Sequence, residues 1–223
     1  MSTIGGPDIT TDGIVLALDA SNTKSYPGSG TTWFDLSGNS NHATLYNSPV
    51  FSTNYVTWDG TNQYAEVTYN SVFAAWSIEQ TVSIWLRHSF TSGRKNPWNQ
   101  AYGGYGTWTH ENGANINAYY GNAGSNALPY TAVNSGTTST NIWNHMTVTR
   151  DTSYIRWYKN GIQTNVASNI YGELTSDTNN ILIGRGYAGY WVGDMGIITA
   201  YNRALTADEI LQNYNATKWR FGS

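Results

Sequence analysis

The closing segment of the chain, residues 180–222, contains the one pattern in the sequence that predicts an α-helix. Two short apolar runs at residues 180–185 and 190–201 come first and are typical of β-strands. Thr206 then precedes Glu209 by three residues, the capping-box spacing in which each side chain binds the backbone N–H of the other residue. Behind this cap lies one apolar stripe at helical spacing, made of Ile210, Leu211 and Tyr214. Because no comparable stripe occurs before residue 206, we expect an all-β protein that ends in one short helix.

Apolar runs separated by turn residues recur along the rest of the chain, as in proteins built from antiparallel strands. Residues 13–19 are apolar on both faces, which predicts a central strand, and residues 81–86 and 143–149 are further strand candidates. Asp-Gly and Asn-Gly pairs accept the positive φ angles of the type I′ turns that join paired strands. Two β-hairpins are therefore expected, Tyr55–Trp58 with Gln63–Tyr69 around Asp59-Gly60, and Tyr154–Lys159 with Ile162–Val166 around Asn160-Gly161.

The composition fits one all-β domain with a neutral, polar surface. Of the 223 residues only 11% are charged, whereas 14% are aromatic and 23 are glycine. The net charge of −3 and the lack of a basic run argue against nucleic acid as a partner. No apolar stretch approaches the roughly 20 residues that span a bilayer, so a membrane partner is not expected either. There is no cysteine, which removes disulfides and thiolate metal sites.

The first 12 residues are polar and carry Gly5, Gly6 and Pro7. They have neither the basic start nor the apolar stretch of a secretory signal, so none is expected. Residues 1–12 are therefore predicted to be an N-terminal arm outside the domain, which is expected to cover residues 13–223. The arm is either a flexible terminus or a segment that docks on a neighbouring subunit.

Three stretches, residues 13–45, residues 143–161 and the closing motif Tyr-Asn-Arg-Ala-Leu-Thr-x-x-Glu-Ile at residues 201–210, carry a resemblance to a known family. They resemble the laminin-G-like domains of the concanavalin A-like lectin/glucanase superfamily. The resemblance implies an antiparallel jelly-roll β sandwich with one short C-terminal helix. It says less about function, because this fold carries lectins, glucanases, adhesion modules and structural proteins.

Standalone domains with these opening and closing motifs resemble bacteriophage virion proteins, such as capsid decorations and tail-fibre or baseplate adhesins. The resemblance implies a non-enzymatic structural or attachment protein of a virion, assembled in the host cytoplasm. Its implied partners are other virion subunits, further copies of itself and, for an adhesin, a host surface polysaccharide. The alternative is a carbohydrate-binding module that is not attached to a particle.

No catalytic pattern stands out. Glucanases of this superfamily carry Glu-x-Asp-x-x-Glu on one strand, whereas none of the five glutamates here has an aspartate two residues later. The four histidines lack zinc-site spacing, and no Gly-x-Ser-x-Gly motif occurs. Glycines at 184, 186 and 189 match the dinucleotide-binding motif by letter, but a strand follows them where the motif needs a helix. We therefore expect no enzyme and a glycine-rich turn at 184–189.

Calcium is the one cofactor that the resemblance suggests, because many laminin-G-like and pentraxin-like domains bind it through loop oxygens. Asp19 with Asn22, or Asp59 with Asn62, could supply some of the six to eight oxygens that the ion needs. The alternative is that these side chains form Asx-turns. No complete ligand set can be named, and no other cofactor is expected.

Residues 91–120 place large rings among glycine, asparagine and threonine, a composition that predicts long loops at one end of the sandwich. We expect a ligand-binding surface there, formed by Trp98, Tyr102, Tyr105 and Trp108 with the amides of Asn96, Asn99 and Gln100. Planar rings offer apolar faces to a sugar while the amides meet its hydroxyls. The alternative is that these rings cover the sandwich end or a subunit contact. Trp58, Trp85 and Trp157, in the paired strands, are expected to be core or sheet-face residues.

Overall fold

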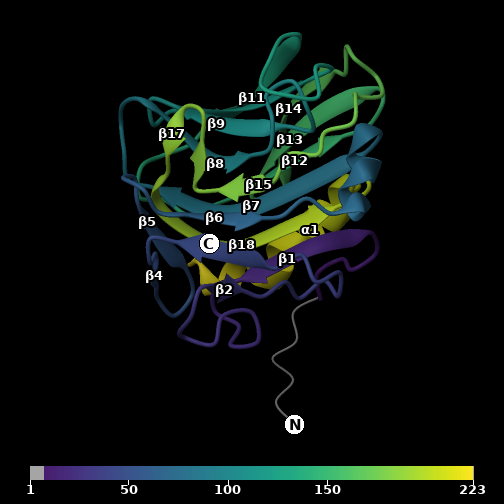
Figure 1. The fold of residues 1–223 in the computed structure, drawn as a ribbon. Helices are drawn as coiled ribbons and strands as arrows, with labels where there is room; N and C mark the ends of the chain where they lie inside the picture. Colours follow the sequence, from purple (N-terminus) through teal and green to yellow (C-terminus); the bar gives the residue numbers. More distant parts are fainter. Residues whose placement is uncertain (1–7, 223) are drawn as a thin grey trace.

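Two eight-stranded antiparallel sheets stack face to face in the computed structural model, which describes residues 8–222 (Figure 1). In pairing order the first sheet contains β14 (Ile162–Ser168), β13 (Tyr154–Lys159), β12 (Asn144–Arg150), β7 (Gln80–His88), β18 (Val192–Tyr201), β5 (Val56–Asp59) and β4 (Val50–Phe51), and β1 (Ile14–Asp19) also pairs with β18. The second sheet contains β11 (Tyr130–Thr137), β10 (Asn115–Gly121), β9 (Thr107–Glu111), β8 (Arg94–Asn99), β15 (Ile181–Ile183), β6 (Tyr64–Val67), β3 (Ala43–Tyr46) and β2 (Thr32–Trp33). A small hairpin, β16 (Arg185–Gly186) and β17 (Gly189–Tyr190), connects β15 to β18.

The predicted jelly-roll sandwich with one C-terminal α-helix, α1 (Ala207–Thr217), is confirmed. One helical element does occur earlier than expected, the 3₁₀ helix η1 (Ser71–Ser77). Its two buried residues, Phe73 and Trp76, are three apart, so they share one face at the three-residue period of this helix and anchor it in the core. A second short 3₁₀ helix, η2 (Lys218–Arg220), follows α1.

Tryptophan fills the space between the sheets. Eight of the ten tryptophans are at most 2% exposed. Seven of them, Trp58 and Trp157 included, pack between the sheets, whereas Trp85 belongs to a cluster beneath α1 on the outer face of the first sheet. Strands β3 and β6 alternate buried with less buried residues, as expected of strands with one face in the core and one toward solvent. The sandwich is therefore held mainly by large apolar rings from both sheets.

Of the two predicted hairpins, one is confirmed and one is wrong. β13 and β14 pair across Asn160 and Gly161, whose φ angles of 53° and 81° are those of a type I′ turn. The turn at Asp59-Gly60 instead connects different sheets, because β5 pairs with β4 and β18 whereas β6 pairs with β3 and β15. The local turn chemistry was recognised, but it does not determine which strand becomes the partner.

The C-terminal helix covers the outer face of the first sheet. The Thr206–Glu209 capping box forms as predicted. The ring of Trp85 on β7 stacks on Phe221 at 4.4 Å, and its indole N–H donates to the Thr217 hydroxyl at 2.8 Å. The buried stripe of α1 is Ile210, Asn213 and Thr217, whereas the predicted Leu211 is 41% exposed. At 11 residues α1 is the longest helix within residues 8–222, and no helix there is long and apolar enough to cross a bilayer.

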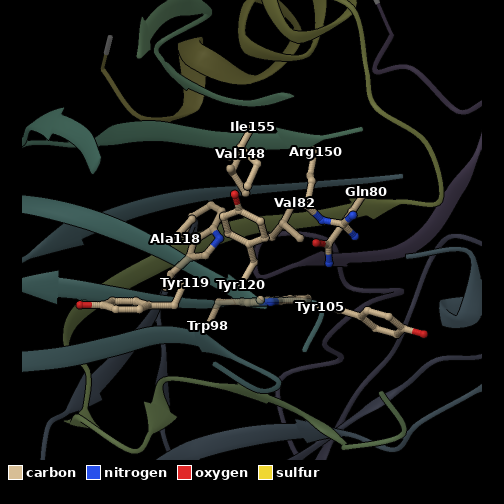
Figure 2. A pocket seen from close by; sticks show the side chains of 12 residues that line it. Gln80, Val82, Trp98, Tyr105, Ala118, Tyr119, Tyr120, Val148, Arg150 and Ile155 are labelled. Carbon is tan, nitrogen blue, oxygen red and sulfur yellow. The ribbon is translucent and has the colours of Figure 1, made fainter. Parts of the chain in front are cut away.

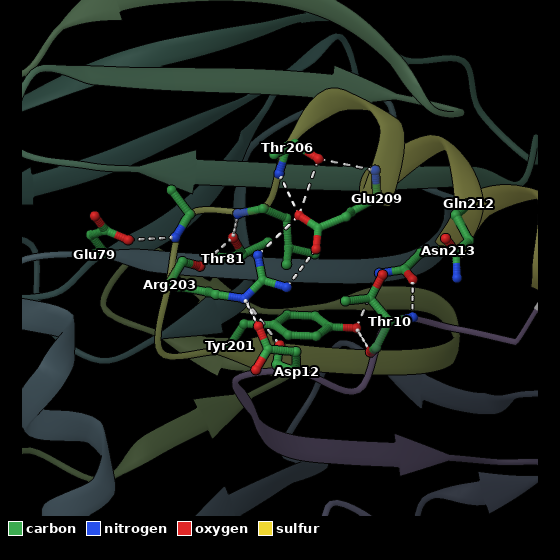
Figure 3. A network of polar contacts seen from close by, with 12 residues as sticks. Thr10, Asp12, Glu79, Thr81, Tyr201, Arg203, Thr206, Glu209, Gln212 and Asn213 are labelled. Atoms are coloured by element: carbon green, nitrogen blue, oxygen red, sulfur yellow. Dashed lines mark hydrogen bonds and ion pairs between the residues drawn. The ribbon is translucent and has the colours of Figure 1, made fainter.

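The end of the predicted N-terminal arm is bound to this helix (Figure 3). Thr10 donates its N–H to the Asn213 side chain at 2.7 Å, and its carbonyl accepts from the Tyr201 hydroxyl at 3.0 Å. The Arg203 guanidinium reaches both Asp12, at 3.0 Å, and Glu209 of the capping box. Residues 8–12 are thus bound to the domain by hydrogen bonds from their backbone and by an ion pair. This corrects the expectation of an arm that is free over these residues. Residues 1–7 lie outside the described part of the chain.

Arg150 joins the first sheet to the end of η1. Its guanidinium is buried and donates to the carbonyls of Trp76, Ser77 and Ile78, which are unpaired within the helix. Burial lowers the pKa of Arg150 to about 10, so the guanidinium stays charged at neutral pH. This positive charge interacts favourably with the negative, C-terminal end of the helix dipole.

We expect Arg150→Met to lower the free energy of unfolding by about 3 kcal/mol, because the buried Trp76 carbonyl loses its donor and the link from the first sheet to the end of η1 is lost. Urea denaturation measures this loss. Arg156→Met is the matched control, since Arg156 pairs with Asp151 near the surface and such pairs contribute about 1 kcal/mol or less. Equal effects of the two substitutions would contradict the role given to Arg150.

Three histidines are buried, and two of them have strongly lowered pKa values. His145 lies beneath α1, with its ring 5.1 Å from that of Trp85, and burial lowers its pKa to about 3. His110 lies 4.3 Å from the ring of His88, and burial, with a smaller contribution from His88, lowers the pKa of His110 to about 3. Both rings are therefore neutral in the folded protein.

Stability should fall as the pH falls below about 6.5, where the unfolded histidines bind protons and the buried ones do not. At pH 5 each of the two histidines should lower the free energy of unfolding by on the order of 2 kcal/mol. Urea midpoints measured from pH 7.5 to pH 5 test this. His145→Gln should flatten the profile, whereas His42→Gln, at an exposed position, should not. A stability that is level over this range would contradict the account.

Candidate functional site

Three of the four predicted ligand-binding residues lie in the core instead of on an exposed surface. Trp98 and Tyr105 are 1% exposed and Trp108 is 2% exposed. They line a narrow pocket of about 20 Å³ between the sheets, together with Arg150 (Figure 2). Such a volume holds about one water molecule and no sugar.

The physical reason is that residues 94–111 form two paired strands with only a short loop between them. Trp98 of β8 and Trp108 of β9 are partners across the strands, and both point inward. The Trp108 ring packs against Trp157 of the opposite sheet at 4.7 Å. Of the glycines in this stretch, Gly103, Gly104 and Gly106 lie in the loop at 100–106, and Gly93 and Gly113 lie just outside the two strands. The polar residues grouped with these rings, Asn96, Asn99 and Gln100, are buried as well.

Trp108→Ala should therefore lower the free energy of unfolding by about 3–5 kcal/mol, the cost of truncating a buried ring. Tyr187→Ala, which removes a ring that is 84% exposed, should change it by about 0.5 kcal/mol or less. Thermal or urea denaturation of both variants measures the difference. A Trp108→Ala variant as stable as the parent would restore the original prediction of an exposed recognition ring.

Tyr102, the fourth predicted residue, forms the floor of an open pocket on the outer face of the second sheet. We call it the tyrosine pocket; its volume is about 480 Å³ and it is lined by Arg94, Tyr102, Tyr119, Asn126, Tyr130 and Tyr187. The ring of Tyr102 is 5% exposed and lies 4.9 Å from Tyr119, 5.6 Å from Tyr130 and 6.2 Å from Tyr187. Four phenol rings thus surround one opening.

The rings come from four different segments of the chain. In β10, Ile116, Ala118 and Tyr120 are buried, so the alternation of the strand directs Tyr119 outward. Tyr130 begins β11, and Tyr187 is at the tip of the β16–β17 hairpin. The amide side chain of Asn126 accepts the N–H of Tyr102 at 3.1 Å and so joins two of the loops.

Arg94 forms the charged wall of the tyrosine pocket and is paired with Glu111, which lies beside the pocket. The Arg94 Nε lies 3.0 Å from a Glu111 carboxylate oxygen, and the Arg94 guanidinium also donates to the Tyr119 hydroxyl at 3.2 Å. Burial opposes the charge on Arg94, but Glu111 outweighs it and raises the arginine pKa. Burial, and next Glu111, raise the pKa of Tyr119. At neutral pH the wall is therefore a guanidinium, a carboxylate and a neutral phenol that can still bond to a ligand.

The hairpin that carries Tyr187 is fixed to β8. The Ala188 N–H donates to the Asn96 side chain at 2.7 Å, and that side chain in turn donates to the Trp108 carbonyl at 2.8 Å. Gly186 lies against Asn96, where a Cβ would come within 2.5 Å of the amide carbon. The glycines of the dinucleotide-like motif thus serve this turn, and β18 follows them as predicted.

Sequence reasoning did not name Arg94, Tyr119, Asn126, Tyr130 or Tyr187 as binding residues, although Tyr119 lies within the ring-rich stretch 91–120. One signal was available, because the apolar alternation of residues 116–120 places Tyr119 on the solvent side. For the others no local signal exists, since only the pairing of distant strands brings them together.

The two residue pairs suggested for calcium are engaged in other contacts. The Asp19 carboxylate is ion-paired with Arg220 and accepts the Ser21 N–H at 3.0 Å. The Asp59 carboxylate accepts the Thr61 N–H at 2.8 Å, which is the Asx-turn alternative. Within residues 8–222, no group of three or more acidic or histidine side chains is placed to hold a metal ion.

The family model for the concanavalin A-like lectin/glucanases superfamily, a laminin-G model, matches residues 59–211, more than half of the chain and all of the tyrosine pocket. No curated protein sequence matches the chain.

Two solved structures illustrate the likeness in fold. The receptor binding domain of a botulinum neurotoxin C/D mosaic serotype superposes with a TM-score of 0.72 at 19% identity, over 92% of this chain and 51% of that one. Trypanosoma rangeli sialidase superposes with a TM-score of 0.69 at 17% identity, over 94% of this chain and 34% of that one. The chain spans about half or less of these proteins, and at such identities the likeness shows a shared fold.

Proposed function

The chain belongs to the concanavalin A-like lectin/glucanase superfamily, and on that premise we propose that it is a non-enzymatic carbohydrate-binding protein whose ligand occupies the tyrosine pocket. The receptor-binding neighbour lends weight to a binding role. The proposal rests on one observation, the convergence of four tyrosine rings with Arg94 and Asn126 on the open face of the second sheet.

This lining suits a sugar. A pyranose ring has apolar faces and a rim of hydroxyls, so it needs flat apolar surfaces together with a few oriented polar groups. Tyrosine supplies a rigid ring and a hydroxyl at low cost in side-chain entropy. Arg94 and Asn126 add charged and amide donors at the rim. A pocket with mixed apolar and convergent polar lining is the usual form of a small-ligand site.

The chemistry of the pocket supports binding without hydrolysis. Glycosidases act through two carboxyl groups or, in sialidases, through a tyrosine nucleophile. None of the six lining residues is acidic, and the carboxylate of Glu111 beside them is held by Arg94. The raised pKa of Tyr119 keeps its phenol protonated at neutral pH, which makes it a weak nucleophile. The donor set also lacks the clustered carboxylates that a metal-dependent site needs, so the proposed binding requires no cofactor.

The biological setting in the proposal is a virion, where the protein would serve as a capsid decoration or a tail-fibre or baseplate adhesin, alone or as a homo-oligomer. Support for this setting comes from the resemblance of residues 13–45 and 201–210 to bacteriophage virion proteins. The competing setting is a carbohydrate-binding module that works free of any particle. Stable attachment of the purified protein to a phage shell or tail would favour the first, and a soluble monomer that binds glycans would favour the second.

Tyr130→Ala and Tyr187→Ala should each weaken glycan binding about tenfold or more, because each removes one wall of the tyrosine pocket. A glycan array identifies the ligand and titration calorimetry measures the affinity. Affinity should be unchanged in the presence of EDTA.

Trp219→Ala is the matched control. Its ring is 70% exposed but belongs to η2, beyond the first sheet, so its loss should leave the affinity unchanged. Binding that survives both tyrosine substitutions, or binding that requires Trp219, would refute the assignment of the pocket.

A further inference from the structure

A second aromatic group lies on the same outer face of the second sheet. Tyr46 of β3 and Tyr64 of β6 are cross-strand partners that point outward, since their neighbours Leu45 and Ala65 are buried. Their rings stack at 4.5 Å with 6° between the planes. The ring of Tyr190 lies 6.4 Å from that of Tyr64. Together with Arg185 these three tyrosines form what we call the flanking cluster.

Arg185 packs against two neighbouring rings and, within residues 8–222, has no protein acceptor. Its guanidinium carbon lies 4.8 Å from the ring centre of Tyr64 and 5.6 Å from that of Tyr190. Every other arginine in the described residues 8–222 donates to a carboxylate or to backbone carbonyls. Over the same residues Arg185 forms no ion pair and no hydrogen bond, so its positive charge and its five N–H donors are available.

The flanking cluster and the tyrosine pocket share one structural element, the β16–β17 hairpin. Arg185 and Tyr190 are cross-strand partners at its base, whereas Tyr187 at its tip contacts Tyr102 in the pocket. From Tyr119 on β10 to Tyr64 on β6 the sheet order crosses β9, β8 and β15, which are four strand intervals and about 19 Å. A single sugar cannot bridge that distance, but a chain of several sugars can.

We propose that the ligand of this face is an acidic polysaccharide that crosses the hairpin, with sugar rings in the tyrosine pocket and a carboxylate bound by Arg185. This inference rests on the proposed carbohydrate-binding function and adds the class of carbohydrate. A carboxylate is the group that a guanidinium binds through two parallel hydrogen bonds. The contacts of Arg185 with the rings of Tyr64 and Tyr190 restrict its orientation and reduce the entropy lost when it binds.

The test begins with an array that carries neutral, carboxylate-bearing and sulfated glycans, from single sugars to long chains. Carboxylate-bearing glycans should bind best, and affinity should rise with chain length. For the best long ligand, Arg185→Gln and Tyr64→Ala should each lower the affinity about tenfold or more. Neither should change the affinity for the shortest fragment that still binds. Arg156→Gln, which removes an arginine from the first sheet, is the matched control and should have no effect.

The measurements distinguish a failure of the acidic-polysaccharide inference from a failure of the proposed carbohydrate-binding function. Binding that is lost in Tyr130→Ala but unchanged in Arg185→Gln and Tyr64→Ala would overturn the extended acidic ligand and leave the pocket intact. Preference for neutral or sulfated chains, or affinity independent of chain length, would overturn it too. No binding to any glycan would refute the proposed function, and this inference with it. Circular dichroism of each variant shows whether a loss of binding reflects a loss of fold.

Discussion

The contact on which the rest of the arrangement depends is the stack of Trp85 against Phe221 and Tyr214, which closes the C-terminal segment over the first sheet. A sheet has two faces, and each must either be covered or be polar enough for water. In β7, β12 and β18 nearly every residue is buried, including outer-face residues such as Thr81, Ser83 and Thr147, and α1 and η2 cover part of this face. Residues 8–12 extend this cover through Asn213 and Arg203. The capping box matters for the same reason, since it sets where the helix starts and hence which rings reach Trp85.

With one outer face closed, the outer face of the second sheet is the open surface of the sandwich. Its strands alternate, and the outward positions carry tyrosine, asparagine and threonine instead of aliphatic residues. Tyrosine suits such a face, because the ring packs on the sheet while the hydroxyl stays wet. The asymmetry between the two sheets thus explains why the tyrosine pocket and the flanking cluster lie on the same side of the molecule.

The sequence predicted what local chemistry determines and missed what depends on distant pairing. The Thr206–Glu209 cap and the Asn160-Gly161 turn act within a few residues, and both form as expected. Asp59-Gly60 has equally good turn chemistry, yet the strands on either side join different sheets. Trp98 and Trp108 were placed on a surface because glycine and asparagine surround them, whereas cross-strand pairing buries both. Most of the tyrosine pocket escaped prediction, because it is assembled from segments at 94, 102, 119, 130 and 187.

The β16–β17 hairpin shows how a motif without its usual function still determines a site. Its glycines match a nucleotide-binding pattern by letter, but Gly186 is required because any side chain would collide with Asn96. That close approach lets Asn96 accept the Ala188 N–H, and the bond holds the hairpin against β8. Once the hairpin is fixed, Tyr187 lies close to Tyr102, and Arg185 lies against the rings of Tyr64 and Tyr190. The tyrosine pocket and the flanking cluster, which are four strand intervals apart on the sheet, therefore share the β16–β17 hairpin. The extended ligand that we propose would cross this hairpin and contact both surfaces.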